Sequence, residues 1–275
     1  MKFSCFLLNS SSISNEVWTI LEDIGATNLY TITDHDQGTR LYCNLPPDVE
    51  REACIHLHAG ITASEEVEFN SVDWEANWAI HAQNYRDGYV HLDLSDFGYT
   101  SSDGENKKIL LKPGPGFGDL SHATTRITLS MMAKFIPGKK VLDIGSGSGV
   151  LSFASVRMGA SEVVGIDIDE DAIIHAQENA ALNKMNKSLS FLLPGQYHPS
   201  ENQELVILMN MIRTEQKVAW DTLSGLHSIP GECFISGILE DERDIYLKEC
   251  EKRNWALLEE FQEECWLGFR FRRNV

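Results

Sequence analysis

The sequence is poor in basic residues and contains no long hydrophobic run. Lysine and arginine number 23 against 41 aspartates and glutamates, so the formal net charge of the 275 residues is −18. Such a charge repels phosphate backbones and anionic lipid, and we therefore expect no direct binding to nucleic acid or to a membrane surface. No run of 18 or more apolar residues is present, which predicts that no transmembrane helix forms.

The chain also lacks the cysteine spacings of metal and redox sites. Its six cysteines include no CxxC pair, and none lies at zinc-ligand spacing with a histidine. We therefore expect buried, reduced thiols, no metal site and a cytoplasmic protein. The apolar stretch 3–8 is too short for the core of a signal peptide, so we expect it to be a first strand.

The acidic residues are distributed unevenly along the chain. Residues 1–100 contain 16 acidic and 4 basic residues, a balance of −12, whereas the remaining 175 residues carry only −6. An acidic N-terminal part favours a basic macromolecular partner. Ordinary solubility explains the same imbalance equally well.

Hydropathy and turn residues divide the chain into three parts. Residues 1–72 follow the order strand, helix, strand, strand, helix, strand, which predicts a small α+β domain of ferredoxin-like type. Residues 73–106 contain two tryptophans and a polar, glycine-containing loop, and we expect them to form a linker. Strands and helices alternate over 107–275, which predicts a mostly parallel sheet covered on both faces, with an antiparallel edge strand at its end.

The most informative segment, 141–149, reads Val-Leu-Asp-Ile-Gly-Ser-Gly-Ser-Gly. An apolar strand there enters a glycine-rich turn and a helix follows, so the backbone can approach a ligand closely and offer free N–H groups. Gly145 and Gly147 fit the first two glycines of the dinucleotide motif GxGxxG, but Val150 occupies the place of the third. This substitution weakens the case for a nicotinamide enzyme.

The next strand, 163–168, leads to two carboxylates. Asp167 and Asp169 lie 22 and 24 residues after Gly145. In adjacent parallel strands this spacing places Asp167 beside the glycine turn, where it can accept hydrogen bonds from two ribose hydroxyls. The alternative for either carboxylate is a cap on the helix that begins near residue 171. We assign the ribose to Asp167 and the cap to Asp169.

These residues resemble a class I S-adenosylmethionine-dependent methyltransferase, and in particular the ribosomal protein L11 methyltransferases (the PrmA family). The most specific likeness is the loop 113–118, Pro-Gly-Pro-Gly-Phe-Gly, followed by His-Ala-Thr-Thr at 122–125. It resembles that family's loop of the form DPGxAFGTGxHxTT. Three further segments are similar to the family, namely 73–78, 208–212 and 236–239.

The resemblance implies a fold, a cofactor and a substrate. The fold is a Rossmann-like methyltransferase domain over 107–275, preceded by a substrate-recognition domain at 1–72. The cofactor is S-adenosyl-L-methionine, and the partner is a basic ribosomal protein, L11, whose amino groups accept the methyl. The cofactor-binding residues that it implies are Thr125, Gly145, Gly147, Asp167 and Asn210.

The resemblance also suggests which residues surround the amine that accepts the methyl group. Methyl transfer from a sulfonium requires an aligned and desolvated nucleophile, and an amine must be neutral to attack. Phe117 and Trp74 could form apolar walls that favour the neutral amine, and Asn210 offers both a donor and an acceptor. His122 is a candidate base, with a structural role in the loop as the alternative.

The chain departs from the family's loop at three positions. Lys112 stands where the family has Asp, and Asp119-Leu120 stand where it has Thr-Gly. Two alternatives therefore stay open. The protein could methylate another protein or a small molecule, or it could be a catalytically silent relative that only binds the cofactor.

Overall fold

The computed structural model describes residues 2–10, 14–34, 38–68, 73–100, 107–185, 188–200 and 203–274. The chain forms two compact units, Met1–Asp73 and Trp74–Val275. Within the described ranges, no helix combines the length and the hydrophobicity that crossing a membrane requires.

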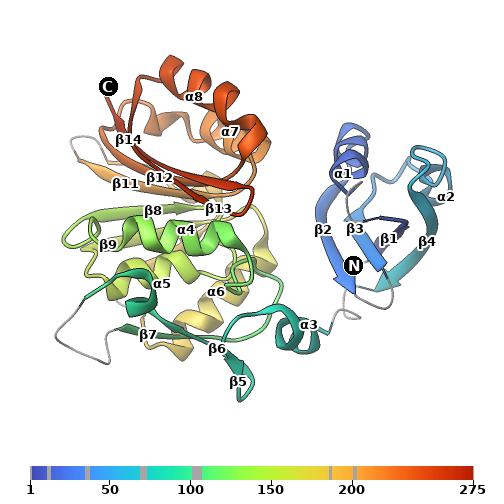
Figure 1. The fold of residues 1–275 in the computed structure, drawn as a ribbon, viewed down its shortest axis with the longest axis horizontal. Coiled ribbons are helices and arrows are strands. Elements are labelled where there is room, and N and C mark those ends of the chain that lie inside the picture. The colour runs from blue at the N-terminus through green and yellow to red at the C-terminus, as the bar shows by residue number, and fades with distance from the viewer. Residues whose placement is uncertain are drawn as a thin grey trace. The chain divides into compact units, whose positions relative to one another are not determined.

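The first unit is built on a four-stranded antiparallel sheet in the order β2-β3-β1-β4 (Figure 1, blue). Helix α1 places Val17 and Leu21 on one face, four residues apart, and packs them into the core beside Phe6 and Leu41. The elements of this unit are β1 (Lys2–Leu8), α1 (Ser14–Asp23), β2 (Thr27–Asp34), β3 (Gly38–Asn44), α2 (Arg51–Cys54) and β4 (Ile61–Glu68).

The second unit contains a seven-stranded sheet in the order β10-β9-β8-β11-β12-β14-β13 and a three-stranded sheet in the order β5-β6-β7. In the large sheet β14 is antiparallel to both of its neighbours, and the other pairs are parallel. The elements are α3 (Trp74–His81), β5 (Tyr85–Arg86), β6 (Tyr89–Asp93), η3 (Leu94–Phe97), β7 (Lys108–Leu111), α4 (Ala123–Met132), β8 (Lys140–Ile144), α5 (Val150–Arg157), β9 (Glu162–Ile166), α6 (Glu170–Leu182), β10 (Leu189–Leu192), η5 (Pro194–Gln196), β11 (Leu205–Asn210), α7 (Arg213–Thr222), η6 (Ser224–Leu226), β12 (Gly231–Leu239), η7 (Glu240–Glu242), α8 (Arg243–Lys252), β13 (Trp255–Glu263) and β14 (Trp266–Arg273).

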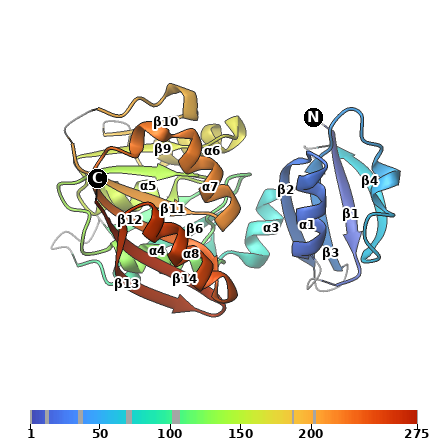
Figure 2. The ribbon, with the colours of Figure 1, turned by 90° about the horizontal axis from the view of Figure 1, so that it is seen from above.

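Helices cover both faces of the large sheet. Helices α4, α5 and α6 pack on one face, and α7 and α8 pack on the other (Figure 1). The view from above places α7 and α8 over the strands (Figure 2). The central strand β11 is buried from Leu205 to Met209, as its continuous apolar run predicts for a parallel strand covered on both sides.

The antiparallel strand is not at the edge of the sheet, where we expected it. The chain turns back after β13 and inserts β14 between β12 and β13. The reason is hydrophobic burial. Leu267, Phe269 and Phe271 of β14 are almost fully buried, whereas Leu257 and Leu258 of β13 are more than 40% exposed. The more apolar strand therefore occupies the inner position.

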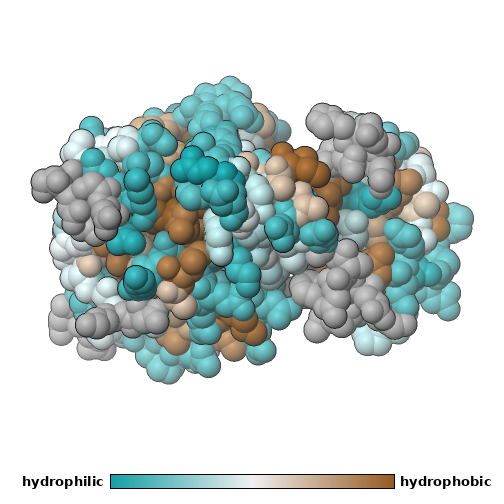
Figure 3. Space-filling model, turned by 90° about the horizontal axis from the view of Figure 1, so that it is seen from below, coloured by the Kyte–Doolittle hydropathy of each residue, from teal (hydrophilic) through white to brown (hydrophobic). Residues whose placement is uncertain are grey.

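Residues 74–100, which we expected to belong to a linker, are part of the second unit. Trp78 of α3 and Val90 and Leu92 of β6 lie in its core. Strand β6 pairs with β7, and this pairing buries the alternating apolar residues of both strands. Of the polar loop that we predicted at 100–106, residues 101–106 lie outside the described residues. Hydrophilic residues cover most of the described surface in the view of Figure 3.

Candidate active site

The glycine-rich turn joins β8 to α5 at the carboxyl ends of the parallel strands. Gly145, Gly147 and Gly149 have φ angles of 73°, 51° and 85°, which side-chain-bearing residues rarely adopt. The backbone N–H groups of Gly145 and Ser146 both donate to the carbonyl of Ile166, at 2.8 and 3.0 Å. The turn is thereby fixed against the neighbouring strand β9.

The loop 113–118 packs its backbone directly on this turn. The Ser148 N–H donates to the Phe117 carbonyl at 2.8 Å, and the Ser148 hydroxyl donates to the Gly118 carbonyl at 3.3 Å. A Cβ on Gly147 would lie 2.6 Å from the Phe117 oxygen, and one on Gly116 would lie 2.5 Å from the Gly147 carbonyl carbon. Both glycines are therefore required by the close approach of two backbones.

His175 of α6 holds the other side of that loop. Its Nδ1 accepts a hydrogen bond from the Gly116 N–H at 3.1 Å, and its Nε2 donates to the Lys112 carbonyl at 2.7 Å. The ring is therefore neutral with its proton on Nε2. Burial lowers the pKa of His175, which favours the same neutral form. The Trp78 ring contacts it edge-on, with the centroids 5.8 Å apart.

Two asparagines continue this row on α6 at intervals of four residues. Asn179 accepts from the Lys112 N–H at 2.7 Å and donates to the Ser148 carbonyl at 3.2 Å. Asn183 accepts from the Leu110 N–H at 2.9 Å and donates to the Leu110 carbonyl at 2.6 Å. We call His175, Asn179 and Asn183 the α6 ladder. Its hydrogen bonds to the described residues outside α6 all go to backbone groups, so it fixes the path of the chain from β7 to the glycine turn.

Asp167 follows β9, and its carboxylate lies at the glycine turn as the spacing predicts. Its Oδ2 accepts from the Gly147 N–H at 2.8 Å, and its Oδ1 accepts from the Asp169 N–H at 3.0 Å. Burial raises the pKa of Asp167, and the two backbone donors act in the opposite direction. Asp169 caps α6 through the Asp171 N–H at 2.9 Å, which confirms the cap assigned to it.

Asp143 is a buried carboxyl that the sequence reasoning overlooked. It lies in β8, two residues before Gly145, and is 1% exposed. Its Oδ2 accepts from the Ser152 hydroxyl at 2.7 Å, and its Oδ1 has no hydrogen-bond partner within the described chain. Burial raises its pKa to about 7. The available signal was an acidic residue inside an otherwise apolar strand.

Asn210 and Thr125, two predicted cofactor ligands, are brought together by the fold. Asn210 is the last residue of β11, and Thr125 lies in the first turn of α4. The Asn210 amide donates to the Thr125 hydroxyl at 3.1 Å. Thr125 is fully buried, and Asn210 is partly buried at the carboxyl edge of the sheet.

His122 caps α4 and lies between two aromatic rings. Its Nδ1 accepts from the Thr124 N–H at 3.4 Å. The ring centroids of Phe117 and Trp266 lie 5.7 and 4.8 Å from that of His122, both in edge-on contact. Burial and the nearby Arg126 guanidinium lower the pKa of His122. We call Phe117, His122 and Trp266 the aromatic rim.

The sequence reasoning missed Trp266 as a member of the aromatic rim. Trp266 begins β14 and pairs with Leu239 at the end of β12. Only the antiparallel insertion of β14 places that residue at the carboxyl edge of the parallel strands. Trp74, the other wall that we expected, begins α3.

The unusual residues at 119–120 are held firmly in place. Leu120 has a φ angle of 68° and is 1% exposed, so an apolar side chain occupies a backbone conformation that favours glycine. Asp119 accepts from the Ser121 N–H at 3.0 Å. Arg126 donates to the Leu120 and Ser121 carbonyls at 3.0 and 2.6 Å and also binds Glu263.

The segment after Asn210 completes the edge of the site. The Met211 side chain lies directly against Gly145, and its carbonyl accepts from the buried Gln216 amide at 2.7 Å. Arg213 pairs with Glu242 and Glu249 at 3.0 and 2.9 Å, so its charge is compensated by two carboxylates. Among the residues that the structure describes, no group of three or more His, Cys, Asp or Glu side chains is arranged to hold a metal ion.

Comparison with known proteins identifies this arrangement. A sequence model described as ribosomal protein L11 methyltransferase (PrmA) matches residues 50–274. The chain belongs to the PrmA family. The match includes the glycine turn, Asp167, the loop 113–118 and Asn210, and it begins within the first unit.

Curated relatives and a solved structure agree with this membership. Ribosomal protein L11 methyltransferases from Dictyoglomus thermophilum and Idiomarina loihiensis are 31% identical over 211 residues and 36% identical over 169 residues. The alignments cover 75% and 61% of this chain, and 69% and 57% of those proteins. The chain thus spans under two thirds of some relatives. The crystal structure of ribosomal protein L11 methylase from Lactobacillus delbrueckii subsp. bulgaricus has a TM-score of 0.53 at 21% identity, covers 67% of this chain and 99% of that one, and shows the shared fold.

Proposed function

We propose that this chain is an S-adenosyl-L-methionine-dependent protein methyltransferase that modifies amino groups of ribosomal protein L11. The observation that carries the proposal is the contact of the loop 113–118 with the glycine turn beside Asp167, in a chain of the PrmA family. The relatives named above are L11 methyltransferases.

The residues around the turn fit a nucleoside with a charged amino-acid tail. Each Asp167 oxygen accepts one backbone hydrogen bond, and a carboxylate oxygen has a second lone pair that a ribose hydroxyl can use. Ile168 is 83% exposed directly beside Asp167 and offers an apolar surface to a purine. The glycines at 145 and 147 leave the backbone uncovered on this side.

The methionine end of the cofactor carries an ammonium and a carboxylate. The Oδ1 of Asp143, two residues before the turn, and the Ser146 hydroxyl, within it, are buried and have no hydrogen-bond partner among the residues that the structure describes. Both oxygens can accept a hydrogen bond from an ammonium group. Asn210 and Thr125 supply neutral polar groups at the strand ends. We assign cofactor binding to Thr125, Gly145, Gly147, Asp167 and Asn210, with Asp143 as an addition.

When bound, the cofactor supplies a methyl group on a positively charged sulfur. The chain's contribution is to orient and desolvate the amine that attacks it. Phe117 is 53% exposed, so it can cover an incoming amine and favour its neutral form, and Asn210 can accept a hydrogen bond from that amine. His122, held by its cap on α4, positions the aromatic rim. Its lowered pKa keeps the ring neutral near pH 7, so it could also accept the proton that the amine releases.

We further propose that the first unit is of ferredoxin-like type and recognises the substrate. The element order β1-α1-β2-β3-α2-β4 and the strand order β2-β3-β1-β4 support the fold assignment. The acidic balance of residues 1–100 supports a basic partner. A cytoplasmic location, where ribosomal proteins are made, completes the proposal.

Labelled cofactor and purified L11 test this function directly. The expected result is label on L11 amino groups by mass spectrometry, lost in Asp167→Ala. Label on another protein but not on L11 would move the assignment to a different acceptor. Cofactor binding without transfer to any protein of a lysate would support a silent relative.

A further inference from the structure

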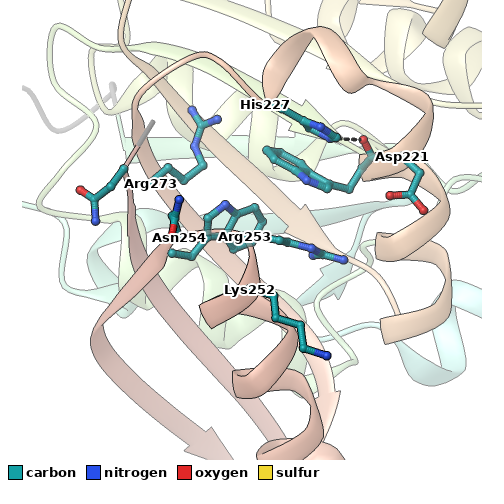
Figure 4. Close-up of a pocket in the computed structure, with 9 residues that line it drawn as sticks. Asp221, His227, Lys252, Arg253, Asn254 and Arg273 are labelled. Carbon is teal, nitrogen blue, oxygen red and sulfur yellow. Dashed lines mark hydrogen bonds between the residues drawn. The ribbon is translucent and has the colours of Figure 1, made fainter.

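A pocket lies at the opposite end of the parallel strands from the glycine turn. Its cavity is about 300 Å³, and its walls come from α7, the loop after η6, the end of α8 and the facing ends of β13 and β14 (Figure 4). In the sheet, Arg273 pairs with Gly231 at the start of β12, and Gly231 pairs with Leu205 at the start of β11. Asn210 ends β11, so the proposed active site is at the far edge of the same sheet.

Arg273 is a buried cation in this pocket without a carboxylate partner. The residue is only 3% exposed to solvent. Its two terminal nitrogens donate to the carbonyls of Leu205, Leu226 and Pro230 at 3.1 to 3.3 Å. Its Nε has no hydrogen-bond partner, and it makes no ion pair among the described residues. Burying an uncompensated charge costs free energy, so a bound anion would stabilise this site.

Two further cations line the same cavity. One terminal nitrogen of Arg253 is buried and has no hydrogen-bond partner in the described part of the chain, and the guanidinium lies 5.4 Å from the centre of the Trp255 ring. Lys252 ends α8 and is exposed at the pocket. Neither residue makes an ion pair within the described chain. The acidic residue of the lining, Asp221, is 3.4 Å from Lys217.

Aromatic rings lie against the two arginines of the pocket. Trp220 stacks on His227 with the centroids 4.8 Å apart and contacts Trp255 edge-on at 4.8 Å. The Arg273 guanidinium lies 5.9 Å from the Trp220 ring. His227 donates to the Trp220 carbonyl at 3.0 Å, the bond drawn in Figure 4, so its position is fixed. A low-dielectric wall strengthens the attraction between the cations and an anion.

We propose that this pocket binds a phosphate-bearing anion. Among the described residues that line the pocket, three cations against one carboxylate leave an excess of two positive charges, which matches the charge of a phosphate monoester near pH 7. Arginine side chains bind phosphate through paired N–H groups, and Arg253 and Arg273 both have unused donors. A cavity of about 300 Å³ is large enough for phosphate with part of an organic group. This binding is independent of the proposed methyl transfer.

The two tryptophans of the pocket provide a direct readout in the full-length protein. Inorganic phosphate and adenosine monophosphate are titrated at low ionic strength while tryptophan fluorescence and binding heat are followed. Excess S-adenosylhomocysteine is present throughout, so that the proposed nucleoside site at the glycine turn is already occupied. We expect saturable binding of at least one of the two. Tighter binding of the nucleotide identifies an organic phosphate as the ligand, and equal binding identifies the phosphate group alone. Adenosine without phosphate should not bind.

Variants locate the binding in this pocket. Arg253→Ala combined with Lys252→Ala should weaken binding roughly ten- to hundred-fold, since charge-assisted hydrogen bonds are lost. Arg243→Ala, which removes a cation of the same helix that is paired with Glu260, should leave it unchanged. Arg273→Gln should abolish the phosphate-dependent rise in melting temperature. Absence of saturable binding by either phosphate, binding of adenosine alone, or equal weakening in Arg243→Ala would overturn the proposal.

Discussion

The Asp167 carboxylate joins the glycine turn to the start of α6, because one oxygen binds the Gly147 N–H and the other the Asp169 N–H. Asp167→Ala removes the proposed ribose acceptor, and we expect affinity for S-adenosylhomocysteine to fall about ten- to hundred-fold. Calorimetric titration measures this. Asp169→Ala is the matched control, because that carboxylate caps α6 and should affect stability more than affinity. Equal loss of affinity in both variants would contradict the assignment.

Asp143 gives the protein a predictable pH dependence. Its pKa rises from 3.8 to about 7 on folding, so the folded state holds a proton that the unfolded state has already released between these values. The stability that this carboxyl contributes is therefore full below pH 4 and is lost as the pH rises toward 7. Asp143→Asn removes the dependence. Its free energy of unfolding relative to the wild type should increase by roughly 2–3 kcal/mol from pH 5 to pH 7.5.

Urea unfolding at several pH values, without cofactor, measures this difference. Asp119→Asn is the control, because that carboxyl lies in an exposed turn and its hydrogen bonds involve a neighbouring serine. A constant difference between Asp143→Asn and the wild type across this pH range would show that Asp143 is ionised in the folded protein.

At the scale of elements, α6 organises the site without contributing a predicted cofactor ligand. The Asn179 side chain donates to the Ser148 carbonyl of the glycine turn, whereas the side-chain hydrogen bonds of Asn183 within the described residues go to Leu110 and Asn179. Asn179→Ala and Asn183→Ala each leave backbone groups without a hydrogen-bond partner, and each should lower the free energy of unfolding by about 1–3 kcal/mol. We expect Asn179→Ala to weaken S-adenosylhomocysteine binding as well, and Asn183→Ala to leave it nearly unchanged. Chemical unfolding and calorimetry on the same two variants separate the effects, and equal affinities would refute a specific role for Asn179.

The arrangement of strands shows which contacts of the site can be predicted from sequence patterns and which cannot. The 22-residue spacing from Gly145 to Asp167 predicts their contact, because one strand–helix–strand unit fixes both ends. The position of Trp266 depends on β14 lying between β12 and β13 in the sheet. This order depends on which of the two last strands buries more apolar surface, and that is a property of the whole sheet. The α6 ladder could not be predicted from the sequence either, since the backbone groups outside α6 that it binds lie 31 to 73 residues away in the chain.

At the scale of the whole molecule, the uneven charge makes its own prediction for the proposed substrate. A net charge of −18 should attract a basic protein over long distances, so kcat/KM for L11 should fall as salt is added. Most of the excess charge lies before residue 100. Asp23→Lys combined with Asp48→Lys changes two exposed positions of the first unit, and a lysine at the end of α1 also suits the helix dipole. We therefore expect the folded state to persist and kcat/KM to decrease, mainly through KM.

The control makes the same change of charge in the second unit, with Asp241→Lys and Glu251→Lys, both exposed. If the first unit receives the substrate, its variant should lose several-fold more kcat/KM than the control at low salt, and the two should converge at high salt because screening removes steering. The cofactor affinity of both should match the wild type, since every charge changed lies outside the glycine turn. Identical losses in the two variants would mean that total charge alone attracts the substrate, and the acidic first unit would then have no special part in recognition.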